Sequence, residues 1–160
     1  MDILVITVGG TIDKVYFDAT SEYEVGEPTV PHVYQGALVT LEYELLPLMR
    51  KDSLEMTDQD RTLIRETCEQ SDQNHILITH GTDTMSDTAE SLLGVEGKTI
   101  VLTGAMAPAR FRETDAVFNI GLATGAVQSL PPGVYIAMNG RIFPAGQVRK
   151  NRQERCFESI

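Results

Sequence analysis

The sequence predicts an α/β fold: one doubly wound, mostly parallel sheet with helices on both faces and no second domain. Continuous apolar runs at 3–8, 76–78 and 99–103 are typical of strands buried on both sides in a parallel sheet. Segments of helical periodicity alternate with these strands, as in α/β proteins. No linker, repeat or low-complexity segment interrupts the 160 residues, so we expect a single domain over 1–160.

The first strand ends at Gly9-Gly10-Thr11, a tight turn that lets backbone N–H groups approach a ligand. The turn matches no nucleotide-binding motif. In the following segment, 13–31, neither the strand nor the helix period holds, and glycine and prolines break it. Because the segment is aromatic, with Tyr16 and Tyr23 among others, we expect a lid over the site, and surface packing is the alternative.

The rest of the chain continues the alternation. Residues 37–46 favour a second strand. Thr57, with Asp60 three residues later, is typical of a helix start, here predicted over 57–70. Further helices are predicted at 86–93 and 112–129. Strand 134–138 is followed by Asn139-Gly140, a strong hairpin signal, and by a return strand at 141–143, with an irregular tail from Pro144.

The stretch 75–85, H-I-L-I-T-H-G-T-D-T-M, carries the densest chemistry. A buried strand ends in hydroxyls, an imidazole and a carboxylate around Gly81, where a turn needs only a glycine and one polar residue. A helix N-cap cluster is the alternative interpretation. Right-handed crossovers place the turns at Thr11, at 81–84 and at 104–106 on one edge of the sheet, where α/β folds bind ligands.

Composition excludes several functions. The formal net charge of −10 argues against a nucleic-acid partner. No apolar run reaches the ~18 residues of a membrane span, and Met1-Asp2 shows no signal-peptide features, so we expect no membrane association. Cys68 and Cys156 lack metal or redox spacing, which indicates a reduced core thiol at Cys68 and favours the cytoplasm. For the basic cluster 149–152, a solvated face is the alternative to a functional role.

Several motifs together resemble the bacterial-type L-asparaginase family. They are V-G-G-T-I at 8–12, T-H-G-T-D-T-M at 79–85, T-G-A-M at 103–106, Tyr23-x-Val25-Gly26, and M-N-G at 138–140 with Lys150 beyond it. The resemblance covers essentially the whole chain and corresponds to the family's N-terminal domain, whose fold is Rossmann-like with three layers. It implies hydrolysis of L-asparagine to L-aspartate and ammonia by a threonine nucleophile, with no cofactor and no metal.

The resemblance also implies roles for individual residues. Thr11 matches the nucleophile and Tyr23 the lid tyrosine that helps to activate it. Thr82, Asp83 and Lys150 match a second catalytic set. The implied substrate contacts are Gly10, Ser53, Leu54, Thr82, Asp83 and Ala105, with Ser53 holding the α-carboxylate and Asp83 the α-amino group.

This sequence departs from the family pattern at Leu54, where a polar residue is common, and contains no counterpart of the family's C-terminal domain. Because the family's sites form between subunits, we expect a homo-oligomer, a dimer or a tetramer. Two alternatives remain open: a non-catalytic module that binds asparagine or aspartate, and an amidase for another amide.

The residue types suit amide hydrolysis. A threonine hydroxyl is a weak nucleophile and needs a base or a proton path, which the phenol of Tyr23 can supply. Desolvation would favour the neutral amine of Lys150, which could act as a general base toward Thr82. The carboxylate of Asp83 favours the charged form of Lys150, and the sequence leaves both protonation states open. Backbone N–H groups at 10–11, around Thr82 or at Ala105 are candidate oxyanion donors. His80 is expected to have a structural hydrogen-bonding role.

Overall fold

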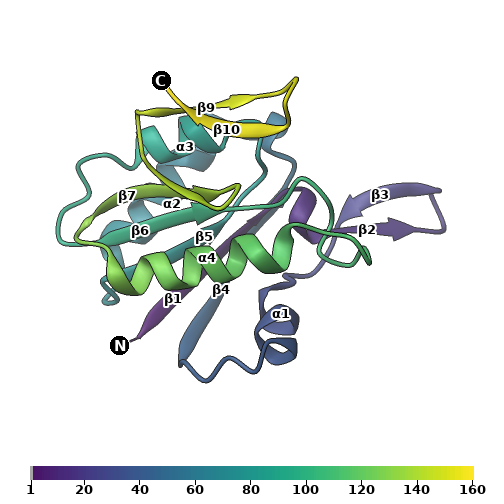
Figure 1. Cartoon of the computed structure of the whole chain (residues 1–160), viewed down its shortest axis with the longest axis horizontal. Helices are drawn as coiled ribbons and strands as arrows, with labels where there is room; N and C mark the ends of the chain where they lie inside the picture. The colour runs from purple at the N-terminus through teal and green to yellow at the C-terminus, as the bar shows by residue number, and fades with distance from the viewer. Residues whose placement is uncertain (1) are drawn as a thin grey trace.

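The computed structural model describes residues 2–160; Met1, part of the predicted amino terminus, lies outside the described residues. The main sheet has six strands in the order β4-β1-β5-β6-β7-β8 (Figure 1). These strands are β1 (Ile3–Gly9), β4 (Tyr43–Lys51), β5 (His75–Thr79), β6 (Thr99–Thr103), β7 (Gly133–Met138) and β8 (Arg141–Pro144). All neighbours pair in parallel except β7 and β8.

Two hydrophobic clusters fill the two faces of this sheet. One lies under α2 (Asp58–Gln70) and α3 (Met85–Ser91), and the other under α1 (Val30–Gly36) and α4 (Ala116–Ser129), which crosses the sheet in Figure 1. Alternate residues of β1 point into opposite clusters, as the pleat of a strand requires. The predicted three-layer α/β fold is confirmed.

Several local predictions are also confirmed. Thr57 and Asp60 form a capping box at the start of α2. Asn139 and Gly140 both have positive φ, 54° and 72°, and connect β7 to β8 as a two-residue hairpin turn. Cys68 is a buried free thiol, and burial raises its pKa to about 12. None of the helices among residues 2–160 combines the length and apolarity needed to cross a bilayer.

Four predictions of secondary structure are wrong. Segment 13–31 is not free of regular structure: it contains the hairpin of β2 (Lys14–Phe17) and β3 (Glu22–Val25), and α1 begins at its end. Pro31 does not break α1 because it lies in the first turn of the helix, where no backbone N–H is needed. The tail is not irregular, since β9 (Val148–Asn151) pairs with β10 (Cys156–Ser159).

The other two errors concern the limits of elements. The strand predicted over 37–46 begins at Tyr43 and runs to Lys51, and the exposed Leu38 has a positive φ of 55° that interrupts extended structure. The helix predicted from 112 begins at Ala116. Its delayed start has a cause: the side chain of Asp115, just before the helix, binds the N–H groups of Met106 and Ala107.

Candidate active site

The turns that follow β1, β4 and β5 meet at the carboxyl edge of the sheet, as predicted. Gly10 has a φ of 92°, and a Cβ added there would collide with the backbone of Gly81. A Cβ added at Gly81 would lie 2.6 Å from the Cβ of Ser53. Because Gly10 and Gly81 have no side chains, the three turns can approach closely. Thr11 and Thr82 are the residues that come directly after these two glycines.

Lys150 reaches this edge from β9. Its Nζ donates to Thr82 Oγ1 at 2.7 Å and lies 2.9 Å from Asp83 Oδ1. The Lys150 side chain is only 15% exposed, compared with 31% for Asp83. The hairpin that carries Lys150 is anchored because Phe157, its partner across the hairpin, is buried in the core beneath α2 and α3. The structure thus brings Thr82, Asp83 and Lys150 together, as the resemblance implied.

Ser53 is held against the turn of Asp83. Its Oγ accepts a hydrogen bond from the Asp83 N–H at 3.2 Å, and its carbonyl accepts one from Thr84 Oγ1 at 2.7 Å. Because Ser53 Oγ acts as an acceptor here, its own proton is still available to a ligand carboxylate. The next residue, Leu54, is 68% exposed and presents an apolar side chain at this edge.

Thr11 begins a short 3-10 turn, Thr11–Asp13. The Gly10 N–H before it donates to Lys51 O at 2.9 Å, so the Gly10 amide is not free for an oxyanion. The Thr11 N–H, at the start of the helical turn, is the remaining donor from this segment. Among residues 2–160 the Thr11 hydroxyl makes no side-chain hydrogen bond.

Tyr23 lies on β3, in the hairpin that projects from the body of the molecule in Figure 1. Its ring makes edge contacts with Tyr16 and Phe111, at centroid distances of 5.5 and 5.8 Å, and is 52% exposed. Within the described part of the chain no hydrogen bond joins Tyr23 to Thr11. The structure therefore does not join the hydroxyl of Tyr23 to that of Thr11, although the two residues are close in the sequence.

His80 is fully buried and has the structural role that was expected. Its Nδ1 lies 2.7 Å from Gly81 O, a group that can only accept, so Nδ1 carries the proton. Its Nε2 then accepts from Thr88 Oγ1 at 2.8 Å. Burial lowers the pKa of His80 to about 4, and the ring is neutral at neutral pH. His80 fixes the turn and is not available as a base.

Two carboxylates that organise the edge were missed by the sequence analysis. Asp115 accepts from the N–H groups of Met106 and Ala107, and from Asn119 Nδ2 at 2.9 Å, which shapes the turn at Ala105. The Ala105 methyl is buried under α4, so only its backbone can face a ligand. Asp13 is buried, accepts from Thr29 N and Oγ1, and has its pKa raised by burial. Neither aspartate belongs to a motif with recognisable spacing.

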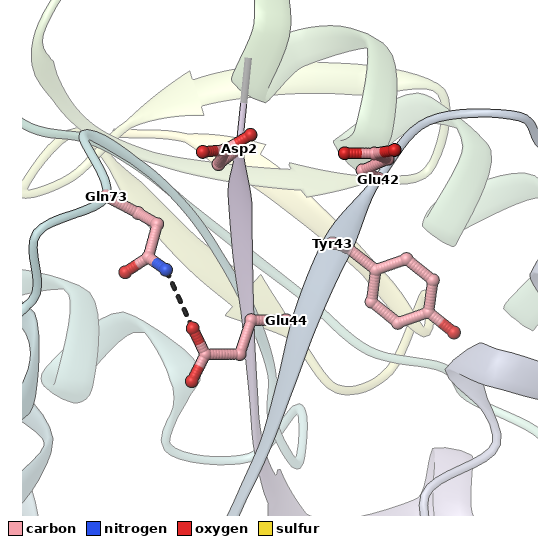
Figure 2. Close-up of a pocket in the computed structure, with 5 residues that line it drawn as sticks. All are labelled: Asp2, Glu42, Tyr43, Glu44 and Gln73. Atoms are coloured by element: carbon pink, nitrogen blue, oxygen red, sulfur yellow. Dashed lines mark hydrogen bonds between the residues drawn. The ribbon is translucent and has the colours of Figure 1, made fainter.

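A separate hollow of about 270 Å³ lies at the opposite end of β1 and β4 (Figure 2). It is lined by Asp2, Glu42, Tyr43, Glu44 and Gln73, and Gln73 Nε2 donates to Glu44 Oε2 at 2.7 Å. No residue of the threonine edge contributes to it. Residues 2–160 hold no group of three or more His, Cys, Asp or Glu side chains placed to bind a metal ion.

Comparison of this chain with known proteins identifies its relatives. The family model described as "Asparaginase, N-terminal" matches residues 2–160. A glutaminase-asparaginase of Acinetobacter glutaminasificans is 29% identical over 167 residues, which cover 93% of this chain and 49% of the relative. A probable periplasmic L-asparaginase of Haemophilus influenzae is 29% identical over 164 residues, covering 93% of this chain and 46% of the relative.

Among solved structures, the thermostable L-asparaginase of Thermococcus kodakarensis matches with a TM-score of 0.83 at 25% sequence identity. The match covers 100% of this chain and 51% of that one. This chain therefore spans about half the length of the relatives and of the solved structure it resembles.

Proposed function

Because the chain belongs to the asparaginase family, matching its N-terminal domain, we propose that residues 1–160 form an amidohydrolase domain that cleaves L-asparagine to L-aspartate and ammonia. One observation carries the proposal: Lys150 Nζ contacts both Thr82 Oγ1 and Asp83 Oδ1 beside the turn that bears Thr11. A buried cap cluster for α3 needs no lysine from a distant hairpin, so the arrangement favours chemistry over a purely structural role.

In the proposed reaction, Thr11 Oγ attacks the side-chain amide carbon and forms a tetrahedral oxyanion. The hydroxyl proton leaves through Tyr23 and ends on the departing nitrogen, which is released as ammonia when the C–N bond breaks. Water then hydrolyses the ester to aspartate and regenerates Thr11. In this proposal the Thr11 N–H donates to the oxyanion, and no metal or cofactor takes part.

The remaining residues bind the substrate or serve proton transfer. Ser53 can donate its free proton to the α-carboxylate, while Asp83 faces the α-amino end. Lys150 positions the Thr82 hydroxyl and supplies a proton path to it. Tyr23 takes its part only when its hairpin closes toward Thr11, and the exposed ring is consistent with such a movement.

Thr11→Val tests the proposal because the substitution is nearly isosteric and removes only the hydroxyl. We expect ammonia release from L-asparagine by the purified protein and none by the variant, with unchanged circular dichroism. Thr20→Val, at an exposed position on the hairpin, is the matched control. Wild-type activity in the Thr11 variant would exclude Thr11 as nucleophile. Ligand binding without any ammonia from a panel of amides would favour a non-catalytic module.

A different amide as substrate is the second candidate. The exposed apolar side chain of Leu54 and the dual name of the Acinetobacter relative favour testing L-glutamine in the same panel. A higher kcat/KM for L-glutamine than for L-asparagine would replace the proposed substrate but keep the reaction class.

The proposed partner of this domain is a second copy of the chain, in a dimer or a tetramer. The support is the outer face of α4, where Phe118 is 64% and Val117 50% exposed, and the helix 116–129 carries no charged residue. We expect an oligomeric mass by light scattering at micromolar concentration, and a shift toward monomer for Phe118→Asp. Leu38→Asp, at an 84% exposed position, should leave the mass unchanged. A monomeric wild type would contradict the proposal.

The cytoplasm remains the proposed location. Its support is the free thiols of Cys68 and Cys156, whereas the Haemophilus relative is named as periplasmic. Cell fractionation of the natural host distinguishes the two compartments.

A further inference from the structure

The basic hairpin β9–β10 places a second cation against the proposed binding carboxylate. Besides Lys150, Arg152 approaches Asp83: its Nε lies 3.5 Å from the same oxygen, Oδ1, that Lys150 contacts at 2.9 Å. Within residues 2–160, Asp83 is the only carboxylate that pairs with Arg152. The single negative charge of Asp83 is therefore shared between two positive charges.

Two carboxylates near this hairpin and the site, Glu158 and Asp52, pair with other cations. Glu158 binds Arg149 at 2.8 Å and Asn151 at 3.3 Å, and these hydrogen bonds hold the pKa of the Glu158 carboxyl below its usual value. On the other side of the site, Asp52 pairs with Lys14 at 2.9 Å. Asp83 thus pairs with two cations, although the chain as a whole carries a net charge of −10.

Arg152 also faces open space. A hollow of about 350 Å³ is lined by Arg149, Lys150, Asn151, Arg152, Gln153 and Glu158. Lys150 belongs both to this hollow and to the cluster with Thr82, so the hollow adjoins the α-amino side of the proposed substrate position. The Arg152 side chain is 68% exposed, and the N–H groups of its guanidinium other than Nε can donate hydrogen bonds to a ligand.

We propose that Arg152 is a specificity-determining residue that selects asparagine whose α-nitrogen is acylated, as at the C-terminus of a peptide, over the free amino acid. The proposal rests on the proposed function in one respect, the assignment of the α-amino end to Asp83. A free α-ammonium would be a third cation at a carboxylate that two cations already neutralise. A neutral acyl nitrogen avoids that repulsion, its acyl group enters the hollow, and the ligand's net negative charge is attracted by Arg152.

Binding of the reaction products tests this without depending on turnover. Calorimetry compares L-aspartate with N-acetyl-L-aspartate, which differ at the α-nitrogen. We expect the wild type to bind the N-acetyl compound roughly tenfold more tightly, and Arg152→Gln to reduce that preference about three- to fivefold, the effect of one exposed charge pair. Added salt should reduce the preference of the wild type in the same direction.

Arg155→Gln is the matched control, because it removes one positive charge from the same hairpin outside the lining of the hollow. It should leave the preference unchanged. Equal binding of the two ligands, no binding of either at millimolar concentration, tighter binding of L-aspartate, or a preference that survives Arg152→Gln would each overturn the proposal.

Ammonia release from L-asparagine and N-acetyl-L-asparagine then separates the two proposals. A protein that shows the Arg152-dependent binding preference but hydrolyses neither amide would refute the amidohydrolase proposal and leave the role of Arg152 intact. Hydrolysis without the binding preference would refute the role of Arg152 and leave the amidohydrolase proposal intact.

Discussion

Lys150 and Thr82 are expected to act as one unit, which a double-mutant cycle can measure. Lys150→Met keeps most of the side-chain volume and removes the donor to Thr82 Oγ1 at 2.7 Å and the partner of Asp83 at 2.9 Å. Thr82→Val removes the other end of the same hydrogen bond. A positioned proton-transfer group contributes about 10²- to 10⁴-fold in rate, so each variant should lower kcat by that factor, or ~3–5 kcal/mol in activation free energy.

The effect on stability should be much smaller. Asp83 is 31% exposed and keeps Arg152 nearby after Lys150 is replaced, so water and the guanidinium compensate for much of the lost charge. We expect a loss of about 1–2 kcal/mol in the free energy of unfolding, measured by urea denaturation. The larger kinetic loss then reports on chemistry and not on partial unfolding.

The assay is ammonia release at saturating substrate for the wild type, both single variants and the double variant. If the two groups serve one proton path, the double variant should be no worse than the more impaired single variant. Lys51→Met, which breaks the 2.8 Å ion pair with Asp60 outside the cluster, is the matched control and should keep kcat within a few-fold. Losses that multiply in the double variant would refute the idea of one unit and assign separate roles to Lys150 and Thr82.

Two further predictions concern the scaffold of the site. The pKa of His80 is about 4 in the folded protein and ~6.5 when unfolded, so its contribution to stability is complete above ~6.5 and is lost, by ~3 kcal/mol, as the pH falls toward 4. Urea midpoints between pH 7 and 4 should show this slope for the wild type and for His32→Gln but not for His80→Gln; an unchanged slope in the His80 variant would contradict the assignment. Gly81→Ala should lower the free energy of unfolding by about 1–3 kcal/mol because its Cβ would lie 2.6 Å from the Cβ of Ser53. Gly36→Ala, where a Cβ meets nothing within 4 Å, should not destabilise, and equal effects in the two variants would argue against the close packing of the turns.

The sequence predicted the buried part of the fold well and the exposed part poorly. Strands β1, β5 and β6 are continuous apolar runs because both faces are covered, and that burial leaves an unmistakable pattern. The β2–β3 and β9–β10 hairpins are short, with the first largely exposed and the second mostly half-buried, so their residues gave no comparable signal. Their pairing depends on turns and on a few buried anchors.

The site shows the same division. Thr82, Asp83 and Lys150 were placed by resemblance, and the structure brings them into contact. Asp115 was not found because it fell inside the helix predicted over 112–129, and its actual bonds to the amides of Met106 and Ala107 depend on how the loop folds back. Sequence spacing cannot show which polar residues will have their hydrogen bonds satisfied by a distant backbone.

The run 79–85 shows why Lys150 discriminates between a reactive site and its scaffold. His80 is buried with both ring nitrogens bonded, Gly81 provides the contact with the turn of Thr11, and Thr84 binds Ser53 O. Only Thr82 and Asp83 of this run face Lys150. A chain could therefore keep the motif for packing alone, and its α/β fold would still require most of these residues. The lysine on β9 makes no comparable contribution to the core, and its contact with Thr82 Oγ1 at 2.7 Å is the one on which the proposed chemistry at that hydroxyl depends.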